Sequence, residues 1–137
     1  MPSVPYVQRE PYATPDDLVL TLPAAVLERV EYAQLIGFLC AASDIVDGYF
    51  ACQYIVPIPT WAYDVRLAVC QIAAVLVLRH IGYNPQGSDE GFQRGRDEAI
   101  AWLEKVSTGR IKLSGGSLRA PEMVGGPVFR STPQRGW

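Results

Sequence analysis

The 137-residue chain is poor in the residues from which metal sites and disulfide frameworks are built. It contains one histidine and only three cysteines, and no two cysteines have the Cys-x-x-Cys spacing. A zinc site or a disulfide framework is therefore not expected. Each cysteine lies among apolar residues of an expected helix, where a free thiol behaves as a small buried apolar group. We therefore predict that Cys40, Cys52 and Cys70 are buried and reduced.

Long apolar runs are also missing. The longest covers residues 67–78, is interrupted by Gln71 and stops at Arg79. Because a membrane-spanning helix needs about 20 apolar residues, this run predicts a core helix of a soluble protein. The first residues contain neither a basic segment nor an apolar one, so no signal peptide is expected.

No pattern in the chain indicates catalysis. His80 has no serine or cysteine near it in sequence, and we expect it at the end of an apolar helix. Asp44 and Asp47 could share one helix face, which a solvated surface explains without metal binding or acid–base chemistry. The Gly-Gly pairs at 115–116 and 125–126 do not have the spacing of a phosphate loop. We predict no enzymatic activity and no cofactor.

Charge is small overall but unevenly distributed. The formal net charge is −2. From Arg110 onward the chain has five basic residues and one acidic residue, a net charge of +4, whereas the preceding part has seven basic and thirteen acidic residues, a net charge of −6. Arginines and aromatic residues in the tail could indicate binding to single-stranded nucleic acid. Docking to a protein partner explains them better, because the cations are few and the rest of the chain is acidic.

The apolar pattern predicts an all-α fold, an antiparallel bundle of three to four main helices preceded by a short N-terminal helix. We expect the main helices near residues 32–54, 62–81 and 90–108. Thr14 and Pro15 would begin the short helix, Pro23 would open another at 24–30, and Gly109 would cap the last. The expected buried positions are Leu35, Phe38, Leu39, Ala42, Ile45, Val46, Tyr49 and Phe50 in the first main helix, and Phe92, Ala99, Trp102, Leu103 and Val106 in the last.

These patterns divide the chain into three parts: an extended N-terminal arm (1–13), a helical bundle (14–109) and an extended tail rich in proline and glycine (110–137). The tail cannot build a core by itself, although its first residues could form a short strand. Its isolated apolar and basic residues are spaced like anchors for a partner. The predicted docking residues are Ile111, Leu113, Leu118, Arg119, Val128, Phe129, Arg130 and Trp137.

Several short blocks occur in an order that resembles the Mu-like prophage head–tail adaptor family. They are Tyr-Ala-Thr at 12–14 with Asp-Leu at 17–18, the stretch 42–59 ending in Pro-Ile-Pro, Ala68 with Cys70 and Ala73, and Ala-Trp-Leu at 101–103 with Gly109. The resemblance covers about residues 12–113. The arm before Tyr12 is longer than the family pattern, and the tail is individual apart from Val-Phe-Arg-Ser at 128–131.

The resemblance implies a structural virion protein at the head–tail junction, made in the bacterial host cytoplasm. Such proteins form a homo-oligomeric ring of twelve copies between the portal protein and the tail. The implied partners are the portal, neighbouring copies, a tail-terminator or head-completion protein, and packaged DNA contacted non-specifically in the lumen. The alternatives are a tail-terminator or head-completion (stopper) ring subunit, or a small helical regulatory or binding module.

Overall fold

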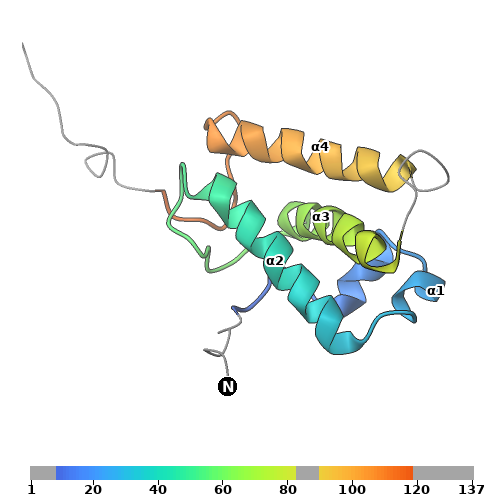
Figure 1. Ribbon diagram of the computed structural model, residues 1–137. Coiled ribbons are helices and arrows are strands. Elements are labelled where there is room, and N and C mark those ends of the chain that lie inside the picture. The colour runs from blue at the N-terminus through green and yellow to red at the C-terminus, as the bar shows by residue number, and fades with distance from the viewer. Residues whose placement is uncertain (1–8, 83–89, 119–137) are drawn as a thin grey trace, which may run out of the picture.

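The computed structural model describes residues 9–82 and 90–118 (Figure 1). The chain forms a 3-10 helix η1 (Pro15–Leu20), a short helix α1 (Ala24–Leu27) and three long helices, α2 (Tyr32–Phe50), α3 (Tyr63–Ile81) and α4 (Glu90–Ser107). Within these ranges there is no strand, only an isolated bridge between Tyr54 and Leu118. The predicted all-α bundle is confirmed.

Helix α3 is the centre of the bundle (Figure 1). It packs against α2, α4 and η1, and α2 also contacts α4 and η1. Ten of its residues are buried, and they lie all around the helix rather than on one face. This follows from the sequence, because α3 is apolar on nearly every side and α4 has a single narrow apolar stripe. None of the described helices is long and apolar enough to cross a membrane.

The ends of the helices have local causes. At the start of η1, the backbone N–H of Thr14 donates a hydrogen bond to the Asp17 carboxylate at 2.9 Å, and Pro15 occupies the first helical position. Gly82 follows the last residue of α3 and Gly109 follows α4, both with φ of 82°. Only glycine adopts this left-handed conformation without a steric cost. The predicted cap at Gly109 is therefore confirmed.

Two predicted helices are shorter than expected. Helix α2 ends at Phe50 instead of residue 54, because the chain turns at 51–53 to bring Tyr54 against the segment 113–118. Helix α1 ends at Leu27 instead of residue 30. Helices α3 and α4 agree with the prediction to within one residue at each end.

Some predicted core positions are wrong. Ile45 is 38% exposed, because the buried stripe of α2 passes through its neighbours Ala42 and Val46 and leaves Ile45 at the edge. Cys52 is exposed in the turn after α2, whereas Cys40 and Cys70 are buried as expected. The other departures are four residues predicted to be buried that are only partly so: Phe38, Tyr49, Phe92 and Trp102.

Candidate docking surface

The segment 110–118 folds back along the loop that joins α2 to α3 (Figure 1). The backbone N–H of Leu113 donates a hydrogen bond to the Tyr54 hydroxyl at 2.7 Å. The N–H of Ile55 donates to the carbonyl of Ser117 at 2.9 Å, and Tyr54 pairs with Leu118 as an antiparallel bridge. The first residues of the predicted tail are thus attached to the bundle. The short strand considered for Ile111 and Leu113 does not form, since neither residue has a strand partner.

Two glycines allow this close approach. A Cβ atom added at Gly115 would lie 2.1 Å from the carbonyl oxygen of Thr60, and one added at Gly116 would lie 2.6 Å from the Tyr54 ring. Neither distance is possible for a real side chain, so the backbone could not run here with any other residue. The Gly-Gly pair therefore serves packing against the loop.

The predicted docking residues fall into three groups. Leu113 is 8% exposed and belongs to the core, and Ile111 is partly buried against it. Leu118 is 60% exposed. The remaining five, Arg119, Val128, Phe129, Arg130 and Trp137, lie outside the described residues. Among the described positions, Leu118 is thus the residue whose side chain is open to a partner.

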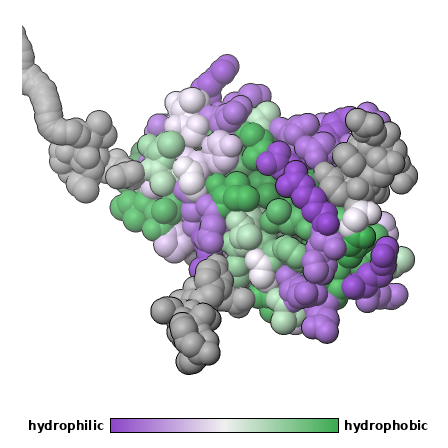
Figure 2. Space-filling view, in the orientation of Figure 1, coloured by the Kyte–Doolittle hydropathy of each residue, from purple (hydrophilic) through white to green (hydrophobic). Residues whose placement is uncertain are grey.

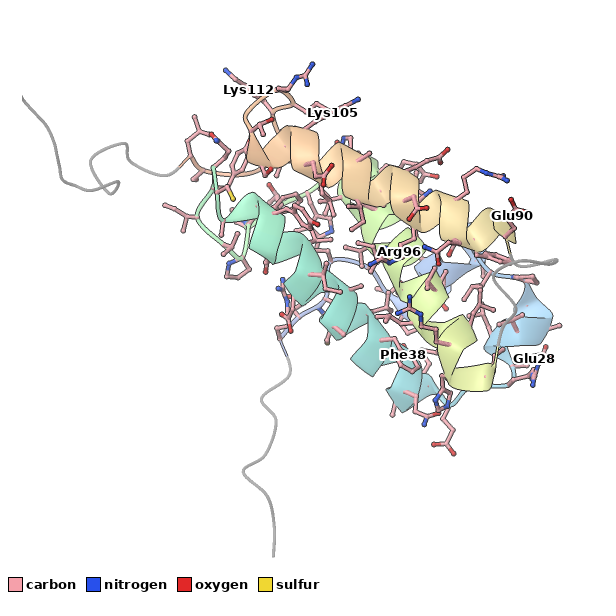
Figure 3. The ribbon with its side chains drawn as sticks, turned by 45° about the horizontal axis from the view of Figure 1, so that its top comes forward. Glu28, Phe38, Glu90, Arg96, Lys105 and Lys112 are labelled. Atoms are coloured by element: carbon pink, nitrogen blue, oxygen red, sulfur yellow. The ribbon has the colours of Figure 1, made fainter. Side chains whose placement is uncertain are left out.

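Leu118 lies in an exposed apolar region at this end of the bundle. Ile55 and Tyr63 are 59% and 52% exposed, and Figure 2 shows apolar surface where the chain continues towards residue 119. The exposed cations Lys105, in the last turn of α4, and Lys112, in the segment that follows α4, lie at the same end of the bundle (Figure 3). Exposed apolar side chains beside cations are typical of a protein-binding surface.

The N-terminal segment is held to α2 by a polar cluster that sequence reasoning missed. The Arg9 guanidinium forms an ion pair with Asp47 and a second one with Asp44 at 3.3 Å, and it lies over the Tyr12 ring. The Tyr12 hydroxyl donates to Asp47 and accepts a hydrogen bond from the Ile58 N–H at 3.0 Å. Asp44 stays largely exposed, as predicted for a solvated face, but the side chain of Asp47 is only 13% exposed.

The cluster changes the titration of its members. Burial raises the pKa of the Tyr12 hydroxyl, and the hydrogen bond to Asp47 raises it further. Burial alone would lower the pKa of Arg9, but its contacts with Tyr12 and Asp47 outweigh burial and raise it. The cluster therefore favours the charged form of Arg9. The cluster fixes residues 9–12 to α2 and offers no reactive group.

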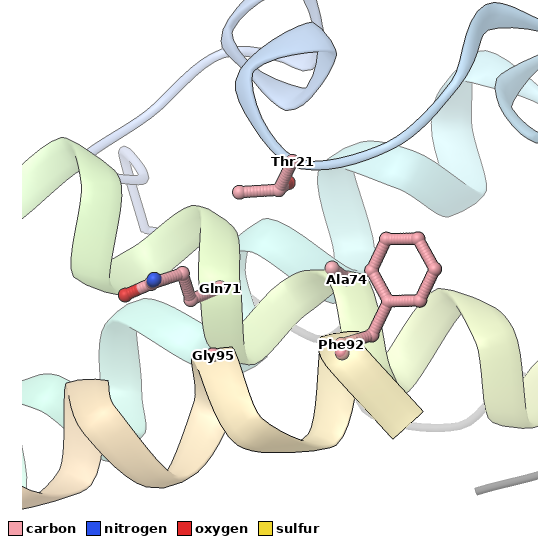
Figure 4. Close-up of a pocket in the computed structure, with 6 residues that line it drawn as sticks. Thr21, Gln71, Ala74, Phe92 and Gly95 are labelled. Carbon is pink, nitrogen blue, oxygen red and sulfur yellow. The ribbon is translucent and has the colours of Figure 1, made fainter. Parts of the chain in front are cut away.

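A groove runs between α3 and α4 on the side that α2 leaves open. Its wider part, about 370 Å³, lies among Thr21, Ala74 and Phe92, with Gly95 on one wall (Figure 4). A second part, about 250 Å³, lies between α3 and α4 near Trp102. Gln71 lines both parts, and its side chain lies 3.5 Å from the position of a Cβ atom at Gly95, so the two parts are neighbours along α3 and α4.

The described residues contain no group of three side chains able to hold a metal ion.

Residues 12–129 match the family model described as Bacteriophage Mu, Gp36. The chain belongs to the bacteriophage Mu Gp36 family. No curated protein matches it.

The range matched by the Gp36 family contains the main features of this surface. It begins at Tyr12, at the polar cluster, covers the groove and the pairing of Tyr54 with Leu118, and continues past the described residues to 129. The matched range therefore includes most of the predicted docking residues. The family membership identifies the chain as a phage protein.

Proposed function

We propose that this Gp36-family chain is a structural virion protein, the head–tail adaptor that forms a ring between the portal and the tail. The observation that carries the proposal is the base of the tail at residues 113–118. It is fixed to the loop after α2 and leaves Ile55 and Leu118 exposed, and Figure 3 shows Lys105 and Lys112 at the C-terminal end of α4, from which this segment continues. A docking element anchored in this way has less freedom to lose when it binds.

The remaining features fit a subunit of a ring. Contacts around a ring join two different faces of neighbouring copies. The chain has apolar side chains exposed at both ends of the bundle, with Val19 and Tyr32 each 64% exposed on the elements opposite Leu118. We propose twelve copies at the head–tail junction, with the portal on one side and a tail-terminator or head-completion protein on the other.

Packaged DNA would pass through the lumen of this ring. The part of the chain before Arg110 has a net charge of −6. Repeated around a lumen, this charge would repel phosphate and let DNA slide without binding tightly. A ring whose lumen is lined by the cations of the tail would contradict this part of the proposal.

The proposal is tested in a phage that carries this gene, by removing residues 119–137. We expect DNA-filled heads and free tails to accumulate, or heads that lose their DNA, in electron micrographs of the lysate. Circular dichroism of the truncated protein serves as the control that the bundle is intact. Normal infectious particles from the truncated gene would show that the tail is not the docking element.

A second measurement separates the adaptor from its alternatives. Purified particles should contain the chain, and electron microscopy should locate it as a ring between the portal and the tail. If a different protein forms the ring on the portal and this chain forms a ring on the tail side of that protein, the chain is a tail-terminator or stopper subunit. Absence of the chain from particles would favour a regulatory or binding module.

A further inference from the structure

The groove between α3 and α4 is open because α4 has glycines where a side chain would fill it. Gly91 and Gly95 lie one turn apart on α4, and both line the wider part of the groove. Among the described residues, a Cβ atom added at Gly95 would meet only the Gln71 side chain at 3.5 Å, and one added at Gly91 would meet nothing within 4 Å. Alanine would therefore fit at both positions, and each glycine costs about 1 kcal/mol of helix stability relative to alanine. Packing among the described residues of one copy does not explain why α4 has glycine at these two positions.

The charges along the groove have one sign. Glu98 and Asp64, both exposed, line the narrower part, and no lysine or arginine among the described residues lines either part. The wider part is mainly apolar, with Phe92 and Ala74 in its wall. The groove therefore suits an extended segment that combines apolar side chains with cations.

Such a segment is present in the chain itself. Residues 119–137 contain three arginines and one acidic residue, together with the apolar pair Val128 and Phe129 directly before Arg130. Fully extended, this segment would span up to about 60 Å. Helix α4 has 18 residues and is roughly 27 Å long. The segment is therefore long enough to leave its own bundle and follow the groove of another copy.

We propose that the groove between α3 and α4 receives residues 119–137 of a neighbouring copy, with the apolar pair near Phe92 and arginines facing Asp64 and Glu98. This inference rests on the proposed ring and assigns one of its contacts between copies. The segment starts at Leu118, beside Tyr54 and beyond the end of α2. The groove lies on the side of α3 and α4 that α2 does not cover. Among the described residues, none of 110–118 lines the groove, so the base of the tail does not occupy the groove of its own copy.

Photo-crosslinking of the full-length protein tests this assignment. Phe129 is replaced by p-benzoylphenylalanine, and the protein is prepared as an equal mixture of 15N-labelled and unlabelled chains. After irradiation of the concentrated protein, mass spectrometry identifies the crosslinked peptides and distinguishes contacts within one chain from contacts between copies. We expect crosslinks between copies that map to residues 67–74 of α3 and 91–102 of α4.

Glycine substitutions supply the matched controls. Gly95→Leu and Gly91→Leu place a side chain in the groove and should each reduce the crosslink yield about tenfold, because the site is filled. Gly48→Leu makes the same change on α2 at an exposed position with nothing within 4 Å of an added Cβ. This control should leave the yield unchanged. High salt should lower the yield, because the ionic contacts are at the surface.

Several results would overturn the inference. They are crosslinks within one chain, crosslinks to other parts of a neighbouring copy, a yield unaffected by Gly95→Leu and Gly91→Leu, and no crosslink at all in the concentrated protein. Crosslinks formed in assembled particles to a different phage protein would also overturn it, but would leave the proposed adaptor function intact. Loss of that function is judged separately, from the particles made by the truncated gene.

Discussion

The hydroxyl of Tyr12 donates a hydrogen bond to the carboxylate of Asp47, 35 residues later in the chain. The same oxygen accepts a hydrogen bond from the buried backbone N–H of Ile58. One side chain thus joins the N-terminal segment, the last turn of α2 and the loop before α3. The Tyr12 residue itself is 1% exposed, so water cannot replace these bonds.

Tyr12→Phe should therefore destabilise the protein although it keeps the aromatic ring. The substitution leaves the Ile58 N–H without its acceptor, and an unpaired buried polar group costs about 1–3 kcal/mol. Urea unfolding followed by circular dichroism would measure the loss. Tyr32→Phe is the control, because Tyr32 is 64% exposed and should change stability by less than about 0.5 kcal/mol. Equal stability of the two variants would mean that the bonds of Tyr12 contribute nothing.

Gly115→Ala should loosen the base of the tail without unfolding the bundle. The added Cβ would lie 2.1 Å from the carbonyl oxygen of Thr60, so the segment must move away from the loop. The hydrogen bond from the Ile55 N–H to Ser117 should then be lost. Hydrogen exchange measured by NMR should show protection of the Ile55 amide reduced by about tenfold or more.

Gly48→Ala is the matched control for that experiment. An added Cβ there meets nothing within 4 Å, and Gly48 lies within α2. Alanine should stabilise the helix by up to about 1 kcal/mol and leave the exchange of the Ile55 amide unchanged. Unaltered protection in Gly115→Ala would show that the segment 113–118 does not need its close approach to the loop.

The two apolar positions Leu103 and Ile45 should respond very differently to alanine. Leu103 is 0% exposed in the core, and truncating such a leucine costs about 2–5 kcal/mol because a cavity remains. Ile45 is 38% exposed, and its substitution should cost less than about 1 kcal/mol. Denaturant unfolding of both variants gives the comparison. A larger loss for Ile45 would mean that α2 is rotated relative to the structure.

The three cysteines should differ in their reaction with thiol reagents. Cys52 is exposed, whereas Cys40 and Cys70 are each 0% exposed. Burial raises the pKa of the Cys70 thiol to about 12, and the nearby Asp17 carboxylate adds to the shift. Iodoacetamide at pH 8 should modify the folded protein at Cys52 and the denatured protein at all three positions. Modification of Cys70 in the folded state would contradict the packing of α3.

The raised pKa of Cys70 also determines whether the free energy of unfolding rises or falls with pH. The thiol of the unfolded chain ionises first, near the ordinary value of 9.0, so the folded state binds more protons above this pH. The free energy of unfolding should therefore fall as pH rises from about 9 towards 12. Cys70→Ala should weaken this dependence. Tyr12, whose pKa is also raised, is present in both proteins and cancels in the comparison.

Features with local causes could be predicted from the sequence. The period of apolar residues predicted α3 and α4 to within one residue at each end, and Gly109 was expected to cap α4. The helix bounds depend on side chains three or four positions apart, and the cap depends on glycine's access to positive φ. The all-α class follows from the same patterns.

Features that join distant segments could not be predicted in this way. Asp47 has the spacing of a solvated position, and only the arrival of Arg9 and Tyr12 makes it a buried partner. The early end of α2 depends on the pairing of Tyr54 with Leu118, which no local pattern indicates. The groove requires Thr21 near Gln71 of α3, a result of how η1 packs on that helix.

The hydrogen bond between Tyr12 and Ile58 also sets a sequence of events during synthesis. The two residues are 46 positions apart, and Leu113 follows its partner Tyr54 by 59. At a translation rate of about 5–20 residues per second, Ile58 is made roughly 2–9 seconds after Tyr12. The N-terminal segment of a nascent chain must therefore wait until the ribosome has passed α2 before its contacts are complete, and the base of the tail joins the bundle later still.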